Sequence, residues 1–179
     1  DARAPLAEGC VGALEVRGPN VAEATVDGES IRLDGWVPTG DLAFLADGRV
    51  VPCGRTKDVL FQLGRTLHAT DVEAVAQGVD GIRAAIACAA GCPDGERAVL
   101  FVVPRTSWRT ARSAIDEARR RVQAETGLAL DAVVPLTAAE VPRTSSGKVR
   151  RAALGERFAA GEFSARVREL DQAAAVGGG

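Results

Sequence analysis

The sequence contains no tyrosine and no methionine, a single histidine, and only 4% aromatic residues. A core must therefore be filled by valine, leucine, isoleucine and alanine, which an overall hydrophobic share of 46% allows. No apolar run reaches the roughly 18 residues that a membrane-spanning helix needs, so we expect no membrane partner. Positive charge is not in excess either, because 22 Lys and Arg stand against 24 Asp and Glu. Since domains that bind nucleic acid broadly are usually basic, we expect no nucleic-acid partner.

Cysteine is also scarce, with four residues among 179, and this excludes a disulfide-rich fold. Cys88 and Cys92 are close in sequence, but no second pair and no neighbouring histidine completes a zinc site. The four thiols, at Cys10, Cys53, Cys88 and Cys92, are therefore expected to be small buried side chains in a reducing compartment. We expect a cytoplasmic protein with no metal held by these residues.

The two ends of the sequence indicate a segment of a longer polypeptide. The chain starts without an initiator methionine, shows no signal peptide and ends in the alanine- and glycine-rich stretch 173–179. Such a stretch is typical of the start of a linker. At roughly 150 residues per domain, the length fits one domain with part of another.

Residues 1 to about 54 carry strand and turn patterns only. Residues 11–17 alternate as a strand does, and 43–51 predict a hairpin around the turn Ala46-Asp47-Gly48. This first region is too short to close a core of its own. Residues 54–58, Gly-Arg-Thr-Lys-Asp, separate it from the rest of the chain and are interpreted as a joint.

The chain from about residue 58 mixes strands with helices, which predicts an α+β fold. Apolar runs of strand length cover 58–63, 82–89, 98–103 and 132–136. Helical patterns cover 71–77, 109–125 and 149–160, and a charged helical tail runs to about 170. Thr70 to Glu73 predict a capping box for the first of these helices, and Gly127 the end of the second.

The stretch 142–148, Pro-Arg-Thr-Ser-Ser-Gly-Lys, predicts a flexible loop that ends in a lysine and precedes a helix. A mobile ammonium at such a place suits a developing negative charge on a phosphoryl or carboxylate oxygen. The stretch is similar to the end of a phosphate-binding P-loop, but Pro142 replaces the first glycine and Val149 replaces the Ser or Thr. On spacing alone, an ordinary solvated lysine at Lys148 is the favoured interpretation.

Two further side chains are candidates for binding a nucleotide. Asp41 is expected on a turn just before an apolar strand, where its carboxylate could accept two hydrogen bonds from vicinal hydroxyls. Arg55 could donate in a fork to a ribose or a phosphate. Taken alone, each has a simpler interpretation: Asp41 bonds its own backbone, and Arg55 or Lys57 forms a surface salt bridge with Asp58.

Four stretches in this order resemble the motifs of the ANL superfamily of adenylate-forming enzymes, which includes acyl-CoA synthetases, peptide-synthetase adenylation domains and acyl-AMP ligases. Residues 11–19 resemble the strand motif of the family, and 35–48 its ribose-binding motif. Residues 54–64, followed by 71–73, resemble its hinge motif, and 142–148 its catalytic-lysine motif. The resemblance spans nearly the whole chain, and four motifs in the right order are far more specific than one.

The resemblance implies a role for each matching residue. Asp41 would bind the ribose hydroxyls of ATP, and Arg55 would approach the same ribose. Lys57 would be the hinge residue, and Gly64 would lie along the route of the pantetheine thiol. Lys148 would be catalytic and would contact both the substrate carboxylate and the α-phosphate during adenylation. A cation there lowers the repulsion between two anions and stabilises charge on the equatorial oxygens.

The resemblance also implies which parts of such an enzyme this sequence lacks. The phosphate loop, the adenine pocket and most of the acid pocket belong to a large N-terminal part, which would also bind most of the ATP and its Mg²⁺. Residues 1–56 would be the β-rich end of that part. Residues 57–160 would be the mobile C-terminal subdomain, a short mixed sheet flanked by helices, and 161–179 a helical tail and linker. The isolated segment would be inactive.

Among branches of the family, acyl-loading ligases of polyketide or mixed synthetases are the most similar, because Lys57 and Phe61-Gln62 differ from the usual hinge stretch of amino-acid adenylation domains. Such a ligase forms an acyl-adenylate and passes the acyl group to a phosphopantetheine thiol, most often on a carrier protein. The alternatives are a CoA ligase, an amino-acid adenylation domain, or a non-catalytic module that docks a carrier protein. The implied partners are the N-terminal adenylation subdomain, a carboxylic acid, and a carrier protein or CoA.

Overall fold

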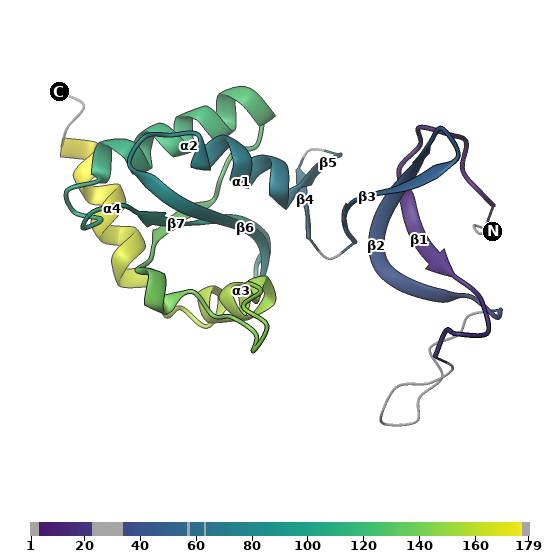
Figure 1. Ribbon diagram of the computed structural model, residues 1–179. Coiled ribbons are helices and arrows are strands. Elements are labelled where there is room, and N and C mark those ends of the chain that lie inside the picture. The colour runs from purple at the N-terminus through teal and green to yellow at the C-terminus, as the bar shows by residue number, and fades with distance from the viewer. Residues whose placement is uncertain (1–3, 23–33, 57, 63, 177–179) are drawn as a thin grey trace. The chain divides into compact units, whose positions relative to one another are not determined.

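The computed structural model describes residues 4–22, 34–56, 58–62 and 64–176 (Figure 1). The chain forms two compact units, unit 1 from Asp1 to Lys57 and unit 2 from Asp58 to Gly179. Within the described ranges, all helices belong to unit 2, and none of them is both long and apolar enough to cross a membrane.

Unit 1 contains a three-stranded antiparallel sheet. Its strands, in spatial order, are β1 (Gly12–Val16), β2 (Val37–Ala46) and β3 (Arg49–Arg55). Asp47 and Gly48 join β2 to β3, and their positive φ angles of 50° and 69° fit the tight turn that matches strand twist. The predicted strand and hairpin are therefore confirmed, although β2 begins earlier than the sequence pattern indicates.

The sheet of unit 1 buries little of its own apolar surface. Ala43 is the only buried hydrophobic side chain among the described residues of this unit, whereas Leu45 and Val50 are exposed. Backbone pairing between strands, rather than a hydrophobic core, holds these residues in place.

Unit 2 combines a hairpin, a three-stranded mixed sheet and helices. The elements are β4 (Val59–Gln62), β5 (Arg65–His68), α1 (Ala69–Gln77), β6 (Ile82–Cys92), β7 (Gly95–Pro104), α2 (Arg112–Thr126), β8 (Ala132–Pro135), the 3₁₀ turn η1 (Ala138–Glu140), α3 (Arg151–Ala159) and α4 (Ser164–Val176). β6 pairs with β7 antiparallel across the predicted turn, and β7 pairs with β8 in parallel through α2. The predicted α+β fold, a short mixed sheet flanked by helices, is confirmed.

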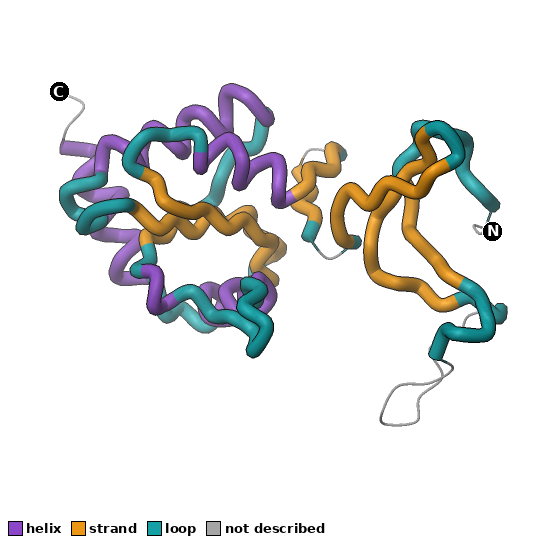
Figure 2. The backbone as a smooth tube through the Cα atoms, viewed as in Figure 1, coloured by secondary structure: helices purple, strands orange, loops and turns teal. Residues whose placement is uncertain are grey.

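Helices cover both faces of this sheet (Figures 1 and 2), and alternate residues of the central strand therefore point into two apolar clusters. Leu100 and Val102 of β7 pack with α1 and α2, where the predicted stripe of α2 contributes Ile115, Ala118 and Val122. On the other face, Phe101 packs with Leu154 of α3 and with Phe163. The second cluster also includes Leu136 and Val141, which belong to the segment that follows β8.

The structure corrects the predicted start of α1. The helix begins at Ala69, two residues earlier than expected, because β5 leads directly into it, and His68 occupies the N-cap without a side-chain hydrogen bond. The capping box predicted from Thr70 to Glu73 is therefore wrong. The Glu73 carboxylate instead accepts a hydrogen bond from the backbone N–H of Ala87 in β6, at 2.9 Å.

The helical tail predicted to about residue 170 is present as α4, but the helix extends further than expected. Helix α4 continues through residues 173–176, where a linker was expected, and alanine has the highest helix propensity of all residues. Phe163 and Leu170 are buried against unit 2, so the segment from 161 packs as part of this unit. Residues 177–179 lie outside the described residues.

The cysteines are less uniform than expected. Cys88 is buried, Cys53 and Cys92 are half-buried, and Cys10 is exposed, while all four thiols are free. The prediction of buried thiols therefore holds for Cys88 alone.

Candidate functional site

Lys148 is presented by a tight hairpin of backbone hydrogen bonds rather than by an open loop. Arg143 and Val149 form an antiparallel bridge. The N–H of Thr144 donates to the Lys148 carbonyl at 2.8 Å, and the N–H of Gly147 donates to the Thr144 carbonyl at 2.9 Å. Gly147 adopts a left-handed φ of 83°, which a glycine accepts without strain. We call residues 142–150 the lysine hairpin.

The Lys148 side chain is exposed, and its ammonium has no hydrogen bond or ion pair within the described part of the chain. The backbone of the same residue is fixed, because its N–H donates to the Thr144 hydroxyl at 3.1 Å. The hairpin therefore combines an ordered backbone with a free cation at its tip. This is an arrangement in which the charge can meet a ligand without first leaving a protein partner.

The downstream end of the lysine hairpin is anchored by Arg151, the first residue of α3. Its guanidinium makes a two-pronged contact with Glu73 of α1, with Nε–Oε1 at 2.9 Å and Nη2–Oε2 at 2.8 Å. Its third nitrogen, Nη1, donates to Oδ2 of Asp58 at 2.9 Å. The side chains of Arg151, Asp58 and Glu73 are only 24%, 21% and 10% exposed. Paired, planar contacts of this kind are among the stronger ionic hydrogen bonds in proteins.

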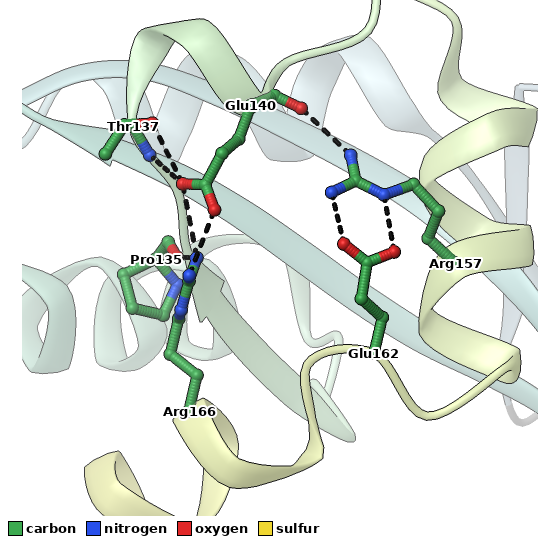
Figure 3. A network of polar contacts seen from close by, with 6 residues as sticks. All are labelled: Pro135, Thr137, Glu140, Arg157, Glu162 and Arg166. Carbon is green, nitrogen blue, oxygen red and sulfur yellow. Dashed lines mark hydrogen bonds and ion pairs between the residues drawn. The ribbon is translucent and has the colours of Figure 1, made fainter.

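The upstream end is anchored by Glu140 in η1 (Figure 3). The Glu140 carboxylate accepts hydrogen bonds from the N–H and hydroxyl of Thr137 at 2.7 and 2.9 Å. The N–H contact and the reciprocal contact of the Glu140 backbone with the Thr137 side chain form a capping box. Arg166 of α4 donates to the same carboxylate at 3.0 Å and to the Pro135 carbonyl at 2.7 Å. Burial by itself raises the pKa of Glu140, but the hydrogen bonds from Arg166 and Thr137 outweigh it and lower this pKa to about 2.

Helix α3 contributes a second contact at the upstream end. Arg157 donates from Nη1 to the Glu140 carbonyl at 2.9 Å, and its other two nitrogens bind the Glu162 carboxylate (Figure 3). The lysine hairpin is thus held on both sides by arginine–carboxylate contacts, with α1, α3 and α4 as the supporting elements.

A buried thiol lies near the downstream anchor. Burial raises the pKa of Cys88 to about 12, although the positive charge of Arg151 acts in the opposite direction. Because the thiolate is the reactive form, this cysteine is not suited to nucleophilic chemistry. In the described ranges, no group of three or more His, Cys, Asp or Glu side chains is arranged to hold a metal ion.

In unit 1, the structure brings Asp41 and Arg55 together. They are register partners in β2 and β3, and Arg55 Nε donates to Asp41 Oδ1 at 3.1 Å. Asp41 therefore lies within a strand, which corrects its predicted place on a turn. Gly40, with a φ of 76°, precedes it, and the pairing shifts between residues 42 and 43, so the strand is irregular at this point.

The predicted surface salt bridge between Arg55 and Asp58 does not form. Arg55 binds Asp41, and Asp58 binds Arg151. The arginine holds one carboxylate oxygen of Asp41, and the other oxygen, Oδ2, has no hydrogen bond to a described residue. A carboxylate that is oriented by one donor and retains a free oxygen fits a hydroxyl-binding role.

One predicted residue lies near the start of unit 2, and another is not described by the structure. Gly64 is exposed in the turn between β4 and β5, with a φ of 75°, and apart from its chain neighbours no residue comes within 4 Å of the place of a Cβ. The open space is compatible with a passing ligand, and the φ angle favours glycine. Lys57, the predicted hinge residue, lies outside the described residues.

Sequence reasoning missed the roles of Asp58, Glu73 and Arg151. Their separations of 78 and 93 residues along the chain leave no local pattern to detect. The only available signal was the pair of arginines directly after Lys148-Val149, and it does not identify a partner.

Comparisons with known proteins agree with the geometry, although no family model matches the chain. The 4-hydroxyphenylalkanoate adenylyltransferase of Mycobacterium marinum is 32% identical over 183 residues, covering 88% of this chain and 29% of the relative. The structure of McyG A-PCP complexed with phenylalanyl-adenylate has a TM-score of 0.84 and 27% identity, covering 97% of this chain and 33% of that one. A structure of fatty acyl-adenylate ligases from E. coli and L. pneumophila has a TM-score of 0.74 and 30% identity, covering 90% and 30%.

The motifs, the fold and these relatives agree on one family. The chain belongs to the ANL superfamily of adenylate-forming enzymes, a family of AMP-forming ligases. It spans between 28% and 31% of the length of the curated relatives it matches.

Proposed function

We propose that this chain is the C-terminal part of an ATP-dependent ligase that activates a carboxylic acid as an acyl-adenylate and transfers the acyl group to a phosphopantetheine thiol. The observation that carries the proposal is the free ammonium of Lys148 on a hairpin anchored at both ends. An exposed cation with an ordered backbone and no protein partner suits a reaction between two anions, a carboxylate and the α-phosphate of ATP.

In this reaction Lys148 contacts the carboxylate and the α-phosphate together and stabilises the charge that builds on the phosphoryl oxygens. Asp41 orients the nucleotide by accepting a hydrogen bond from a ribose hydroxyl, while Arg55 holds the carboxylate in place. The carboxylate oxygen attacks the α-phosphorus, the bond to the β-phosphate oxygen breaks, and pyrophosphate leaves. The Mg²⁺ that accompanies ATP would be held by the part of the enzyme that precedes this chain.

The thiol step requires that the acyl-adenylate meet a pantetheine arm. We propose that unit 2 rotates at Lys57, so that Lys148 serves adenylation in one pose and the exposed turn at Gly64 faces the thiol in the other. Lys57→Pro would then slow thioester formation more than adenylation. Equal loss of both half-reactions would contradict a hinge at this residue.

The relatives support this function without deciding the branch. One is named a fatty acyl-adenylate ligase and another carries a PCP beside its adenylation domain. The acceptor proposed here is a carrier protein, with free CoA and an amino-acid substrate as alternatives within the family. A non-catalytic module that docks a carrier protein is the alternative of a different class.

Carboxylate-dependent ATP–pyrophosphate exchange tests the proposal, measured on the complete product of the gene across a panel of acids. Lys148→Ala should reduce exchange to a small but measurable residual rate while leaving the unfolding transition unchanged, since its side chain is exposed. Arg105→Ala is the matched control, because this arginine is also exposed and its side chain has no ion pair among the described residues. No exchange with any acid in the wild type would favour the docking module, and exchange unaffected by Lys148→Ala would remove the lysine from its role.

A further inference from the structure

We infer that Arg151 is a positioning residue that ties the lysine hairpin to Asp58, the first residue of unit 2, so that Lys148 moves with unit 2 as one rigid body. This inference rests on the proposed function of Lys148. Arg151 itself touches no substrate in this scheme and acts only through the hairpin that precedes it.

The geometry of the Arg151 contact fixes the end of the lysine hairpin. Arg151 stands three residues after Lys148 and uses all three of its guanidinium nitrogens on two carboxylates. A planar guanidinium can satisfy two carboxylates at once, whereas an ammonium is a single point charge. The direction of the chain as it leaves the lysine hairpin is therefore fixed by a contact that only arginine makes in full.

Both carboxylates that bind Arg151 are themselves fixed. Glu73 is 10% exposed and also accepts a hydrogen bond from the backbone of Ala87 in β6. Asp58 is held through its own carbonyl, which accepts a hydrogen bond from the N–H of Ala69 at the start of α1 at 2.9 Å. Arg151 thus joins the lysine hairpin to α1, to the central sheet and to the residue next to the proposed hinge.

The positioning effect of Arg151 can be separated from its contribution to stability. A partly buried ion pair contributes little net stability, because the cost of removing the charges from water offsets their attraction. Its directional contacts nevertheless restrict where the attached backbone can lie. Arg151→Lys retains the charge and loses the planar fork, so it should leave the chain folded while the lysine hairpin loosens.

The kinetic test uses the complete gene product in the exchange assay. Arg151→Lys should lower kcat for adenylation by about tenfold or more, because small misplacements of a reacting group have effects of that size. KM for ATP should stay within about twofold, since Asp41 and Arg55 belong to unit 1 and are unchanged. Arg120→Lys, which alters an exposed pair with Glu117, is the matched control and should behave as wild type.

A double-mutant comparison shows whether Arg151 acts through Lys148. If it does, Arg151→Lys should have almost no further effect in the Lys148→Ala background. Full multiplication of the two effects, or a wild-type kcat for Arg151→Lys, would overturn the inference. An increase in KM for ATP with kcat unchanged would also overturn it.

A second readout does not depend on activity and so separates failure of the inference from failure of the proposed function. In the 179-residue chain, Arg151→Lys should accelerate amide hydrogen exchange at Thr144, Gly147 and Lys148, while the amides of β7 retain wild-type protection. Faster amide hydrogen exchange in Arg151→Lys, together with no ATP–pyrophosphate exchange in the wild type, would support Arg151 as the anchor of the hairpin and contradict the proposed enzymatic function. Unchanged amide hydrogen exchange at the lysine hairpin would contradict the anchoring role of Arg151, whatever the enzymatic activity.

Discussion

Glu140→Gln should destabilise unit 2 by an amount that depends on pH. The wild-type carboxylate has a pKa of about 2 in the folded chain, against an ordinary value of 4.5. A shift of this size corresponds to at most about 3 kcal/mol of stability at neutral pH. Because the Glu140 side chain is 29% exposed, solvent screening reduces the expected effect to about 1–2 kcal/mol. The neutral amide keeps the size of the side chain and removes the charge that binds Arg166.

The pH dependence has a definite sign. The pKa of Glu140 is lower in the folded state than in the unfolded state, so its contribution is fully present above about pH 4.5. As the pH falls toward 2, the carboxylate becomes protonated in both states and the contribution disappears. The difference in unfolding free energy between wild type and Glu140→Gln should therefore shrink progressively from pH 5 to pH 2.

Urea denaturation followed by tryptophan fluorescence measures this difference. Trp108 packs against the core of unit 2, and a Trp36→Phe background makes it the only tryptophan, so the signal reports this unit alone. Glu117→Gln is the control, because its pair with Arg120 is exposed and should contribute less than about 1 kcal/mol. A destabilisation by Glu140→Gln that is the same at pH 7 and pH 3 would refute the assignment of the effect to this carboxylate.

Three other outcomes follow from burial and exposure. Leu154→Ala should reduce the unfolding free energy of unit 2 by about 2–5 kcal/mol, since Leu154 is fully buried, and a loss below 1 kcal/mol in the same denaturation assay would contradict its packing. Iodoacetamide at pH 8 should modify the exposed Cys10 of the native chain but not Cys88, whose pKa burial raises to about 12; mass spectrometry should find both modified only in urea. Asp41→Asn should change unfolding by less than about 1 kcal/mol, because its pair with Arg55 is largely exposed, and should raise KM for ATP; an unchanged KM would exclude ribose binding.

The strands of the mixed sheet of unit 2, β6, β7 and β8, were predictable because most of their residues are buried. A central strand such as β7 reads as an uninterrupted apolar run, and its length distinguishes it from a helix. Gly127 likewise marked the end of α2, where it adopts the left-handed φ of 75° expected of a C-cap glycine. These features depend on neighbours in sequence, so the sequence alone predicts them.

The capping box shows where local reasoning fails. Thr70 to Glu73 have the pattern of a capping box, yet Glu73 lies on the core face of α1 and binds β6 and Arg151 instead. The capping box that forms is at Thr137 and Glu140, with the same residue types at the same spacing. The pattern cannot distinguish the two, because the choice depends on donors that only the tertiary fold brings near Glu73.

The candidate site, like the fold, was predictable from the sequence only where local sequence patterns determine it. The motifs predicted Lys148 between a strand and a helix and assigned Asp41 and Arg55 to the same ribose. The structure places these two residues opposite each other in β2 and β3. The turn expected at Asp41 was wrong, because strand pairing extends through Gly40 despite its positive φ angle. The anchors of the lysine hairpin had no signature, since each joins segments that are distant in sequence.

The anchors of the lysine hairpin have a second consequence for Lys148, which concerns the carboxylates that take part in them. Asp58, Glu73, Glu140 and Glu162 are each bound by an arginine in the described structure. An arginine matches a carboxylate with two parallel hydrogen bonds, which a lysine cannot do, so these acidic groups favour their present partners over Lys148. Among the described residues, the ammonium therefore has no free carboxylate in these anchors to compete with a substrate. Replacing Arg151 by a neutral residue would release two carboxylates close to the hairpin, so Arg151→Met should impair adenylation more than Arg151→Lys, which still neutralises them.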